Sequence, residues 1–336
     1  MSGFASDALW VVTSYFNPTR SARRYANYKR FRRELGAPLL AVELAEQGHH
    51  QLEQDDADIL ISLKGEGFIW QKERLINLGI AALPAAVRHV AWVDCDVIFG
   101  RHDWVIAAQQ ELDRDGGLLH LFGRVVHLPA EGSAASDHAE LADITPLISE
   151  ASLGHAVTLG HGVEALRTCY DQASRRSRGN TWATGIALAA PRTVIERCGL
   201  YDEAIVGGGD AILMCAALDQ LKEDLMGRQV NRMEWNRICQ WASRAAKAGL
   251  FNNFRHLEQT IYQLWHGRLV DRRYGRRHQI TADFEFGAAK HLRLDANGAW
   301  RWTEPGGGLA AAVRAYFLSR NEDGEPRSGC HEKASG

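Results

Sequence analysis

Two aspartates stand one residue apart in the stretch HVAWVDCDVIFG, residues 89–100. Asp is disfavoured within strands, yet apolar residues flank Asp94 and Asp96 on both sides. Side chains at i and i+2 of an extended chain point to the same side, and burying two unpaired carboxylates is costly. A hard divalent cation such as Mn²⁺ or Mg²⁺, which takes oxygen ligands and shares its shell with phosphates, offsets that cost. The alternative is an ordinary strand end with polar residues in solvent.

A second carboxylate follows three glycines in VGGGDAILM, residues 206–214. Glycine is used where φ is positive or where a ligand approaches the backbone closely. Asp210 would stand at the N-terminus of a helix, where Asp is a good cap. At the floor of a glycine-lined cleft, the same carboxylate suits a general base.

His266 lies within YQLWHGRLVDRRYGRR, residues 262–277. A neutral imidazole can complete a metal shell begun by Asp96, and a packed core histidine is the alternative. Arginines and lysines gather here and near the N-terminus, where they indicate either solvated helix faces or partners for phosphate groups. The two basic clusters consist of Arg20, Arg23, Arg24, Lys29, Arg30, Arg32 and Arg33, and of Arg268, Arg272, Arg273, Arg276 and Arg277.

The overall composition excludes several classes of protein. The 336 residues are 46% hydrophobic and carry a net charge of −2, which gives no global reason to expect nucleic acid or an anionic membrane as partner. The six cysteines form no CxxC pair, which argues against a zinc knuckle or a thioredoxin motif. No stretch approaches the ~18 apolar residues of a membrane span, and the first residues lack the pattern of a signal peptide. We expect a soluble, cytoplasmic protein without a transmembrane segment.

The elements that must position these residues alternate between strand and helix through residue 123. Strand-like runs and helical periodicities are separated by short connections, which predicts an α/β layer structure with a mostly parallel sheet. Ligands of such sheets bind at the carboxyl ends of the strands, where the Asp pair is expected. The expected strands cover residues 8–16, 39–44, 56–63, 89–99 and 116–123, and the expected helices cover residues 19–35, 70–83 and 104–112.

The second half of the chain is predicted with less regularity. A strand is expected over residues 181–191, followed by a short helix, the glycine cluster, a helix after it, and helical periodicity over residues 219–263. The C-terminal stretch NEDGEPRSGCHEKASG is polar and is expected to be disordered. Because there is no repeat and no clear linker, a single domain is expected over residues 1–303, with a C-terminal extension, residues 304–336.

Four stretches, taken in order, resemble the nucleotide-sugar glycosyltransferases of the GT-A (Rossmann-like) fold. They are SYFNP after the first strand, WQKERLINLGIAAL, WVDCDVIF with its D-x-D pattern, and GLYDEAIVGGGDAIL. The last is similar to the G-x-D … W-G-G-E-D segment of the β-1,4-galactosyltransferase and polypeptide N-acetylgalactosaminyltransferase families, and LWHG follows where some members place a metal-binding histidine. The resemblance implies a GT-A sheet, mixed and mostly parallel, flanked by helices. It divides the domain into a nucleotide-sugar-binding half, residues 1–125, and an acceptor half, residues 126–303, with a helical insertion, residues 219–263.

The resemblance also implies an activity: transfer of a hexose from a nucleoside diphosphate sugar, UDP-linked, to a hydroxyl of a glycan, lipid-linked or protein acceptor. Asp96 would bind Mn²⁺ or Mg²⁺ directly, and His266 would be another ligand. Asp94 would contact the ribose, or the metal through water. Asp210 would deprotonate the acceptor hydroxyl, which implies inversion at the anomeric carbon.

Further contacts are expected beside the Asp pair. Arg74 and Asn77 lie three apart on the expected helix 70–83 and share a face. This face is expected to lie over the cleft beside the Asp pair, and an ordinary helix with a polar side is the alternative. Gly209 stands where the family has Glu and Val206 where it has Trp, which leaves the donor sugar and the acceptor pocket open. The expected nucleotide-binding residues are Thr13, Phe16, Asn17, Arg74, Asn77 and Asp94, and the expected sugar-binding residues are Trp182, Gly208 and Gly209.

Three other functions use the same features. A phosphatase of the haloacid dehalogenase type would use the first Asp as nucleophile, although its motif usually lies near the start of the fold. A nucleotidyltransferase would use the same metal site, although NPTRSARR lacks the glycines of its usual loop. A non-catalytic carbohydrate-binding domain could stack sugars on some of the ten tryptophans.

Overall fold

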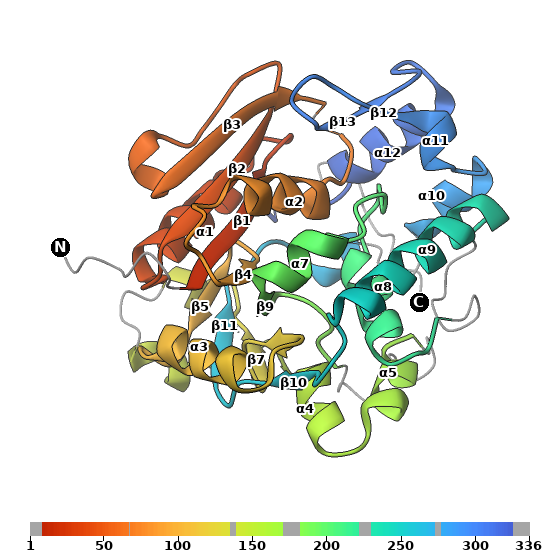
Figure 1. Ribbon diagram of the computed structural model, residues 1–336. Helices are drawn as coiled ribbons and strands as arrows, with labels where there is room; N and C mark the ends of the chain where they lie inside the picture. Colours follow the sequence, from red (N-terminus) through yellow and green to blue (C-terminus); the bar gives the residue numbers. More distant parts are fainter. Residues whose placement is uncertain are drawn as a thin grey trace, which may run out of the picture.

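The computed structural model describes residues 9–66, 68–134, 139–170, 182–221, 230–272 and 277–324 (Figure 1). Its strands are β1 (Leu9–Phe16), β2 (Leu39–Glu46), β3 (Ile59–Gly65), β4 (His89–Val93), β5 (Val97–Phe99), β6 (Leu119–His120), β7 (Arg124–His127), β8 (Ile148–Ala151), β9 (Ala187–Pro191), β10 (Arg255–His256), β11 (Thr260–Gln263), β12 (Leu292–Leu294) and β13 (Trp300–Trp302). Its α-helices are α1 (Ala22–Glu34), α2 (Lys72–Ala82), α3 (Trp104–Asp115), α4 (Leu153–Thr158), α5 (Gly162–Tyr170), α7 (Arg192–Cys198), α8 (Gly209–Ala217), α9 (Arg232–Ala248), α10 (His278–Asp283), α11 (Ala288–His291) and α12 (Gly308–Leu318).

The larger sheet of the described residues has seven strands in the order β10-β6-β9-β4-β1-β2-β3. Strands β4, β1, β2 and β3 are parallel, and β10 is parallel to β6. Strand β9 is antiparallel to both β4 and β6, so these two point the same way. The carboxyl ends of β1, β2, β4, β6 and β10 therefore share one edge of the sheet. The predicted mixed, mostly parallel sheet flanked by helices is confirmed.

Helices cover both faces of this sheet (Figure 1). Alternate residues of β1 point to opposite faces: Val12 belongs to a core formed with α2, α7, α8, α9 and α12, and Val11 to a core formed with α1 and α3. Because both faces are buried, the central strand β4 is an unbroken buried run rather than an alternating one. The result is a three-layer α/β/α arrangement.

The predicted strand 89–99 is interrupted at the Asp pair. Strand β4 ends at Val93, Cys95 and Asp96 form a turn, and β5 begins at Val97 in a second sheet with the order β5-β11-β7-β8. Asp94 and Asp96 therefore lie where the chain passes from one sheet to the other. Because the two aspartates do not lie within one strand, the expectation that both carboxylates point to the same side of a strand does not apply.

The expected helical insertion, residues 219–263, is partly wrong. Helix α9 (Arg232–Ala248) lies within it, and residues 222–229 lie outside the described residues. The chain then forms β10, which joins β6, and β11, which joins both β5 and β7. Both strands are short and pair with strands that are distant in the sequence. The helical periodicity of the preceding residues was therefore continued too far along the chain.

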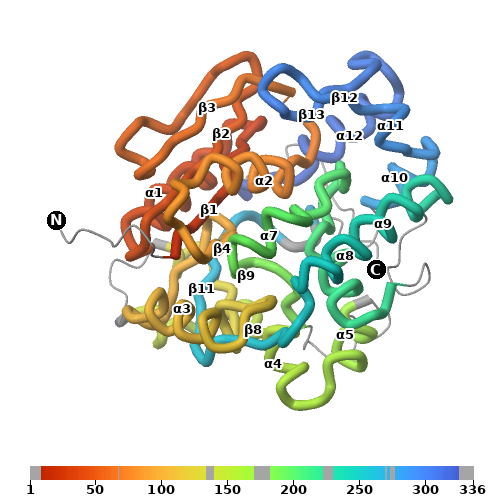
Figure 2. The backbone as a smooth tube through the Cα atoms, in the orientation of Figure 1, coloured from red at the N-terminus to blue at the C-terminus, as the bar shows by residue number. Residues whose placement is uncertain are grey.

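The described part of the C-terminal extension, residues 304–324, packs against the rest of the fold. Helix α12 buries Leu309, Val313 and Phe317, and the blue end of the chain runs beside α2 and β13 in Figure 2. The first residues of the expected disordered tail, Asn321 to Gly324, are described, and residues 325–336 lie outside the described part. Among the described residues, every helix is too short or too polar to cross a membrane.

Candidate active site

Backbone contacts fix the turn that carries the Asp pair. The Thr13 hydroxyl donates to the Val93 carbonyl (2.7 Å), the Asp94 amide donates to the Ile186 carbonyl (2.8 Å), and the Leu264 amide donates to the Asp96 carbonyl (2.8 Å). Strand β1, the start of β9 and the end of β11 thus converge on residues 94–96. Thr13, an expected nucleotide-binding residue, is fully buried and holds the end of β4.

The Asp94 carboxylate is paired with a lysine. Lys72, at the first turn of α2, places its Nζ 2.7 Å from Asp94 Oδ1 and 3.3 Å from Asp210 Oδ2. Only 12% of the Lys72 side chain is exposed. The Asp pair and the glycine cluster, predicted from separate stretches, therefore meet through a residue that the sequence analysis did not select.

Glu73 is a third carboxylate of this cluster. It is buried, and its pKa is raised to about 7, first by burial and then by Asp210. Burial, with Asp96 and Asp210, raises the pKa of Asp94 to about 6 despite the opposing charge of Lys72. Burial alone would lower the pKa of Lys72, but the three carboxylates outweigh it and keep that pKa well above its ordinary value. The single buried ammonium of Lys72 therefore interacts with all three carboxyl groups.

Asp96 has a different set of partners. Its Oδ2 lies 2.9 Å from His266 Nδ1, and Gln263 Nε2 donates to its Oδ1 (3.4 Å). Burial would raise the pKa of Asp96, but His266 foremost, together with Arg272 and Gln263, outweighs burial and lowers that pKa to about 2. Asp96 is therefore ionised at neutral pH.

The tautomer of His266 follows from its contacts. Nδ1 lies 2.9 Å from the Leu264 carbonyl as well as 2.9 Å from Asp96 Oδ2, and both of these atoms are acceptors. Burial and Arg272 lower the pKa of His266 below its ordinary value, so the ring is neutral with its proton on Nδ1. Nε2 then carries a lone pair on the side of the ring that faces away from Asp96, so the two residues can ligate one ion only after the imidazole turns its ring. Two carboxylates and one neutral imidazole are a donor set that suits Mn²⁺ or Mg²⁺.

Two glycines shape the surroundings of the carboxylates. A Cβ atom on Gly185 would lie 2.4 Å from the Asp210 carboxylate, so only glycine leaves that carboxylate its place. A Cβ atom on Gly209 would lie 2.4 Å from Glu73 Oε1. Gly209, an expected sugar contact, therefore packs against Glu73. Gly208 begins α8 with φ of 93°, a left-handed conformation that favours glycine.

A cavity of about 140 Å³ lies at the carboxyl ends of β1 and β2 and is lined by Tyr15, Asn17, Glu43 and Gln51, among others. The Asn17 amide donates to Gln51 Oε1 (2.9 Å) and to the Ser21 carbonyl (2.9 Å), which anchors the loop after β1. Phe16 points away into the core, where its ring packs edge-on against a ring of α12 at 5.6 Å.

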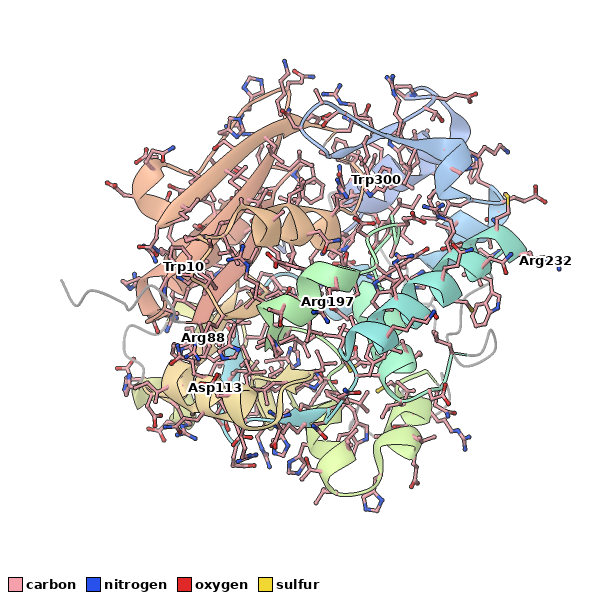
Figure 3. The ribbon with its side chains drawn as sticks, in the orientation of Figure 1. Trp10, Arg88, Asp113, Arg197, Arg232 and Trp300 are labelled. Atoms are coloured by element: carbon pink, nitrogen blue, oxygen red, sulfur yellow. The ribbon has the colours of Figure 1, made fainter. Side chains whose placement is uncertain are left out.

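Arg74 and Asn77 contact a different part of the molecule from the Asp pair. Arg74 Nη1 and Asn77 Nδ2 each lie 3.2 Å from Asp202 Oδ2, and Asn77 exchanges two hydrogen bonds with the backbone of Leu200. Arg74 also lies over the ring of Trp300, labelled in Figure 3 beside α2. These contacts hold the loop before the glycine cluster and the β12–β13 hairpin against α2. The donors of both side chains are thus engaged by this loop and hairpin, and the expected nucleotide-binding role of Arg74 and Asn77 stays a prediction.

Trp182 is half-buried and packs against the core that contains α8 and α9. Its carbonyl accepts from the Cys169 thiol (3.2 Å). It stands three residues before Gly185, the glycine that faces Asp210, and its role as a sugar contact stays a prediction.

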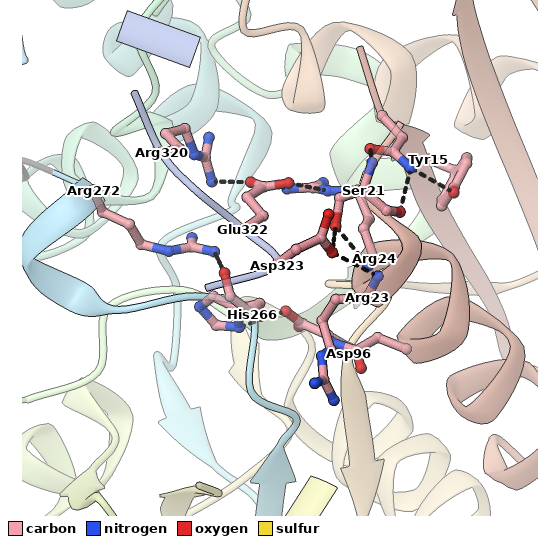
Figure 4. A network of polar contacts seen from close by, with 12 residues as sticks. Tyr15, Ser21, Arg23, Arg24, Asp96, His266, Arg272, Arg320, Glu322 and Asp323 are labelled. Carbon is pink, nitrogen blue, oxygen red and sulfur yellow. Dashed lines mark hydrogen bonds and ion pairs between the residues drawn. The ribbon is translucent and has the colours of Figure 1, made fainter. Parts of the chain in front are cut away.

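The C-terminal segment Arg320–Gly324 lies beside the Asp96–His266 pair (Figure 4). Glu322 Oε1 lies 2.6 Å from Arg24 Nη2 and 3.0 Å from Arg320 Nη2. Asp323 Oδ1 accepts from the Ser21 hydroxyl (2.7 Å) and the Arg23 amide (2.9 Å) at the start of α1. Figure 4 shows this acidic segment between α1 and the loop that carries His266.

The two basic clusters meet at this segment. Arg24 from the first cluster bonds Glu322 through both Nε and Nη2, and Arg272 from the second donates to the His266 carbonyl (2.9 Å). Both arginines interact electrostatically with Glu322. Arg24 also interacts with Asp96, and Arg272 with His266. Arg273 and Arg276 lie outside the described residues.

Lys72, Glu73 and Glu322 were missed from the sequence. Lys72 and Glu73 begin an otherwise amphipathic helix, where charged residues are usual, and Glu322 lies in a polar tail. The sequence did contain one signal for Lys72 and Glu73. Both charges lie in WQKER, at the start of a helix whose apolar face is buried, so they are close to the core.

No protein-family model matches this chain, and no curated protein matches it either. Solved structures do resemble it. Glucosyl-3-phosphoglycerate synthase from Mycobacterium tuberculosis, in complex with Mn²⁺, UDP-glucose and phosphoglyceric acid, has 10% sequence identity and a TM-score of 0.42 over 88% of this chain and 86% of that one. S. aureus TarS 1-349, in complex with UDP-GlcNAc, has 9% identity and a TM-score of 0.37 over 71% of this chain and 66% of that one, just under two thirds of its length. The catalytic domain of Drosophila β1,4-galactosyltransferase 7, in complex with xylobiose, has 10% identity and a TM-score of 0.32 over 64% and 62%. At these identities and TM-scores the resemblance is one of fold alone.

Proposed function

We propose that this chain is a metal-dependent glycosyltransferase that moves a hexose from a nucleoside diphosphate sugar, UDP-linked, to a hydroxyl of a glycan, lipid-linked or protein acceptor. One observation carries the proposal. Asp96 and His266 lie 2.9 Å apart beside Asp94, at the sheet edge where β1 and β4 end. Crevices at the carboxyl ends of parallel strands are where ligands of open α/β sheets bind.

Asp96, His266 and Asp94 would hold Mn²⁺ or Mg²⁺. When bound, the ion supplies Lewis-acid stabilisation of the diphosphate leaving group. At neutral pH Asp96, with a pKa of about 2, is ionised, and His266, with a lowered pKa, is neutral; its ring would turn so that the deprotonated nitrogen faces the ion. Lys72 partly neutralises Asp94, so we assign Asp94 the weaker role, contact with the ribose or with the metal through water.

The nucleotide base would enter the cavity lined by Tyr15, Asn17 and Gln51. This cavity opens where β1 and β2 end, on the same sheet edge as the Asp pair. Arg24 and Arg272 supply positive charge beside Asp96 and His266, which suits phosphate oxygens.

Asp210 would accept the proton of the acceptor hydroxyl. A side chain at position 185 would displace the Asp210 carboxylate, and Lys72 at 3.3 Å orients it. A base on the acceptor side that acts directly on the attacking hydroxyl corresponds to a single displacement, with inversion at the anomeric carbon. Trp182, which precedes Gly185, is proposed as a stacking surface for a sugar ring.

The test is UDP binding by calorimetry, with and without Mn²⁺. Wild type is expected to bind UDP only when Mn²⁺ is present. Asp96→Asn is expected to lose this Mn²⁺-dependent binding of UDP. Asp283→Asn, an exposed aspartate on α10, is the control and should behave as wild type.

Turnover separates the transferase from its alternatives. A UDP-sugar that yields UDP in the presence of a sugar acceptor supports transfer, and Asp210→Asn should then lower kcat and leave UDP binding unchanged. Release of phosphate from sugar phosphates, or of pyrophosphate from nucleoside triphosphates, would replace the proposal by a phosphatase or a nucleotidyltransferase. No binding of UDP under any condition would contradict the UDP-linked donor.

A further inference from the structure

Three ligand-type side chains converge at the other end of the sheet edge. His155 of α4, His256 of β10 and Glu258, two residues beyond, place one nitrogen or oxygen each within 4.8 Å of one another. His256 Nε2 lies 3.1 Å from His155 Nδ1 and 3.0 Å from Glu258 Oε2. None of these residues belongs to the site around Asp94 and Asp96.

Both ring nitrogens of His256 have contacts that suit a metal ligand. The Thr158 hydroxyl has one hydrogen, which it donates to the Gly154 carbonyl (3.1 Å). The same hydroxyl lies 3.2 Å from His256 Nδ1, where it can accept the ring proton once Nε2 binds a cation. Without a cation, Nε2–H donates to the Glu258 carboxylate, and a bound cation would displace that proton and lie between Glu258 and His155.

The surrounding backbone leaves room for this convergence. A Cβ atom on Gly123 would lie 3.0 Å from His256 Cδ2 and 3.5 Å from Glu258 Oε2. A Cβ atom on Gly154 would lie 2.6 Å from the Arg255 carbonyl, so glycine lets α4 approach β10 closely. The cluster is thus built by packing of α4 against the edge strand.

We propose that His155 Nδ1, His256 Nε2 and the Glu258 carboxylate bind one Zn²⁺ ion. Two imidazoles and a carboxylate are a recognised zinc donor set, which leaves a fourth position for water. The hydrogen bond from His256 Nδ1 to Thr158 is the kind of outer contact that fixes the tautomer of a metal ligand. The ion cross-links α4 to the edge of the sheet.

This site is separate from the proposed catalytic one. Strands β6 and β9 lie between β10 and β4, which at strand spacing puts the two sites about 14 Å apart. The catalytic donors are mainly carboxylates, which suit Mn²⁺ or Mg²⁺, whereas imidazoles favour zinc. The zinc proposal therefore does not depend on the proposed activity.

The experiment titrates the chelator-treated full chain with ZnCl₂ by calorimetry, in wild type and in Asp96→Asn. The Asp96→Asn chain is expected to retain one zinc equivalent. Adding His256→Gln to it is expected to abolish that equivalent, and Glu258→Gln, at an exposed position, is expected to weaken it without a change in the circular dichroism spectrum. Thr158→Val should weaken zinc binding about 10–100-fold, as loss of an outer contact does.

His161→Gln, an exposed histidine in the loop after α4, is the matched control and should leave zinc binding unchanged. The proposal is overturned if Asp96→Asn binds no zinc, if binding survives His256→Gln, or if His161→Gln abolishes it. Co²⁺ gives a second readout, since an intense visible absorption of the Asp96→Asn chain that disappears in His155→Gln supports a site of low coordination number.

Discussion

Lys72 Nζ lies 2.7 Å from Asp94 Oδ1, so the first of the two aspartates is neutralised by the protein itself. The second, Asp96, contacts His266 instead. The pair that looks symmetric in the sequence is thus divided between a lysine-centred cluster of acids and an imidazole. The two carboxylates have pKa values of about 6 and about 2, and this asymmetry is the basis for assigning direct metal ligation to Asp96.

Lys72→Met should destabilise the protein, because it leaves Asp94, Glu73 and Asp210 without their shared cation. Loss of one partner of a buried pair costs about 3–5 kcal/mol. The remaining acids can take up protons in acid, so the loss in the free energy of unfolding should be larger at pH 8 than at pH 5. Urea unfolding at both pH values measures this. Lys247→Met, on the exposed side of α9, is the control, and an equal effect of the two substitutions would contradict the cluster.

Glu73→Gln should change how stability depends on pH. The pKa of Glu73 is raised from 4.5 to about 7 in the folded protein. The tighter proton binding stabilises the fold in full below pH 4.5, and this stabilisation is lost as the pH rises through 7. The free energy of unfolding falls by about 3 kcal/mol over this pH range, and a glutamine at position 73, which does not titrate, avoids this loss. The variant should therefore gain stability over wild type above pH 7, measured by denaturant unfolding across pH 4.5–8. Glu304→Gln, an exposed position, should follow wild type throughout.

Gly185→Ala tests the position of Asp210. The added Cβ would lie 2.4 Å from the carboxylate and must displace it. If Asp210 is the base, kcat should fall on the order of 100-fold, the effect of a misplacement of about 1 Å. Metal-dependent UDP binding should persist, since it depends on Asp96. Gly306→Ala is the matched control because nothing lies within 4 Å of its Cβ position. Unchanged kcat in Gly185→Ala would argue against Asp210.

Glu322→Gln should have the opposite pH dependence to Glu73→Gln. Burial opposes ionisation of Glu322, of whose side chain 7% is exposed, but Arg24 and Arg320 outweigh it and hold the pKa of Glu322 well below its ordinary value. This contribution is present above pH 4.5 and is lost as the pH falls below it. The substitution should cost about 3–5 kcal/mol at pH 7, and less in acid. Thermal unfolding at pH 7 and pH 4 tests this; a loss that grows in acid would contradict the assignment.

Much of the fold could be predicted because buried strands and helices place apolar residues at regular spacings in the sequence. The first strand was expected over residues 8–16 and is Leu9–Phe16, and the helix expected over residues 70–83 is Lys72–Ala82. Each is long enough for its apolar spacing to be clear. Strands β10 and β11 were missed because they have two and four residues and are completed by β6, β5 and β7.

The sequence by itself determined which residue types reach the carboxyl edge of the sheet: an Asp pair after a buried strand, an Asp after three glycines and a His after a tryptophan. Only the tertiary structure decided which charge meets which. Lys72 joins Asp94 to Asp210, His266 joins Asp96, and the acidic C-terminal segment joins the two arginine clusters. The physical reason is that hydrophobic periodicity is local, whereas a buried charge is paired with whatever the packed layers bring within about 4 Å of it, and that distance is set by the whole fold.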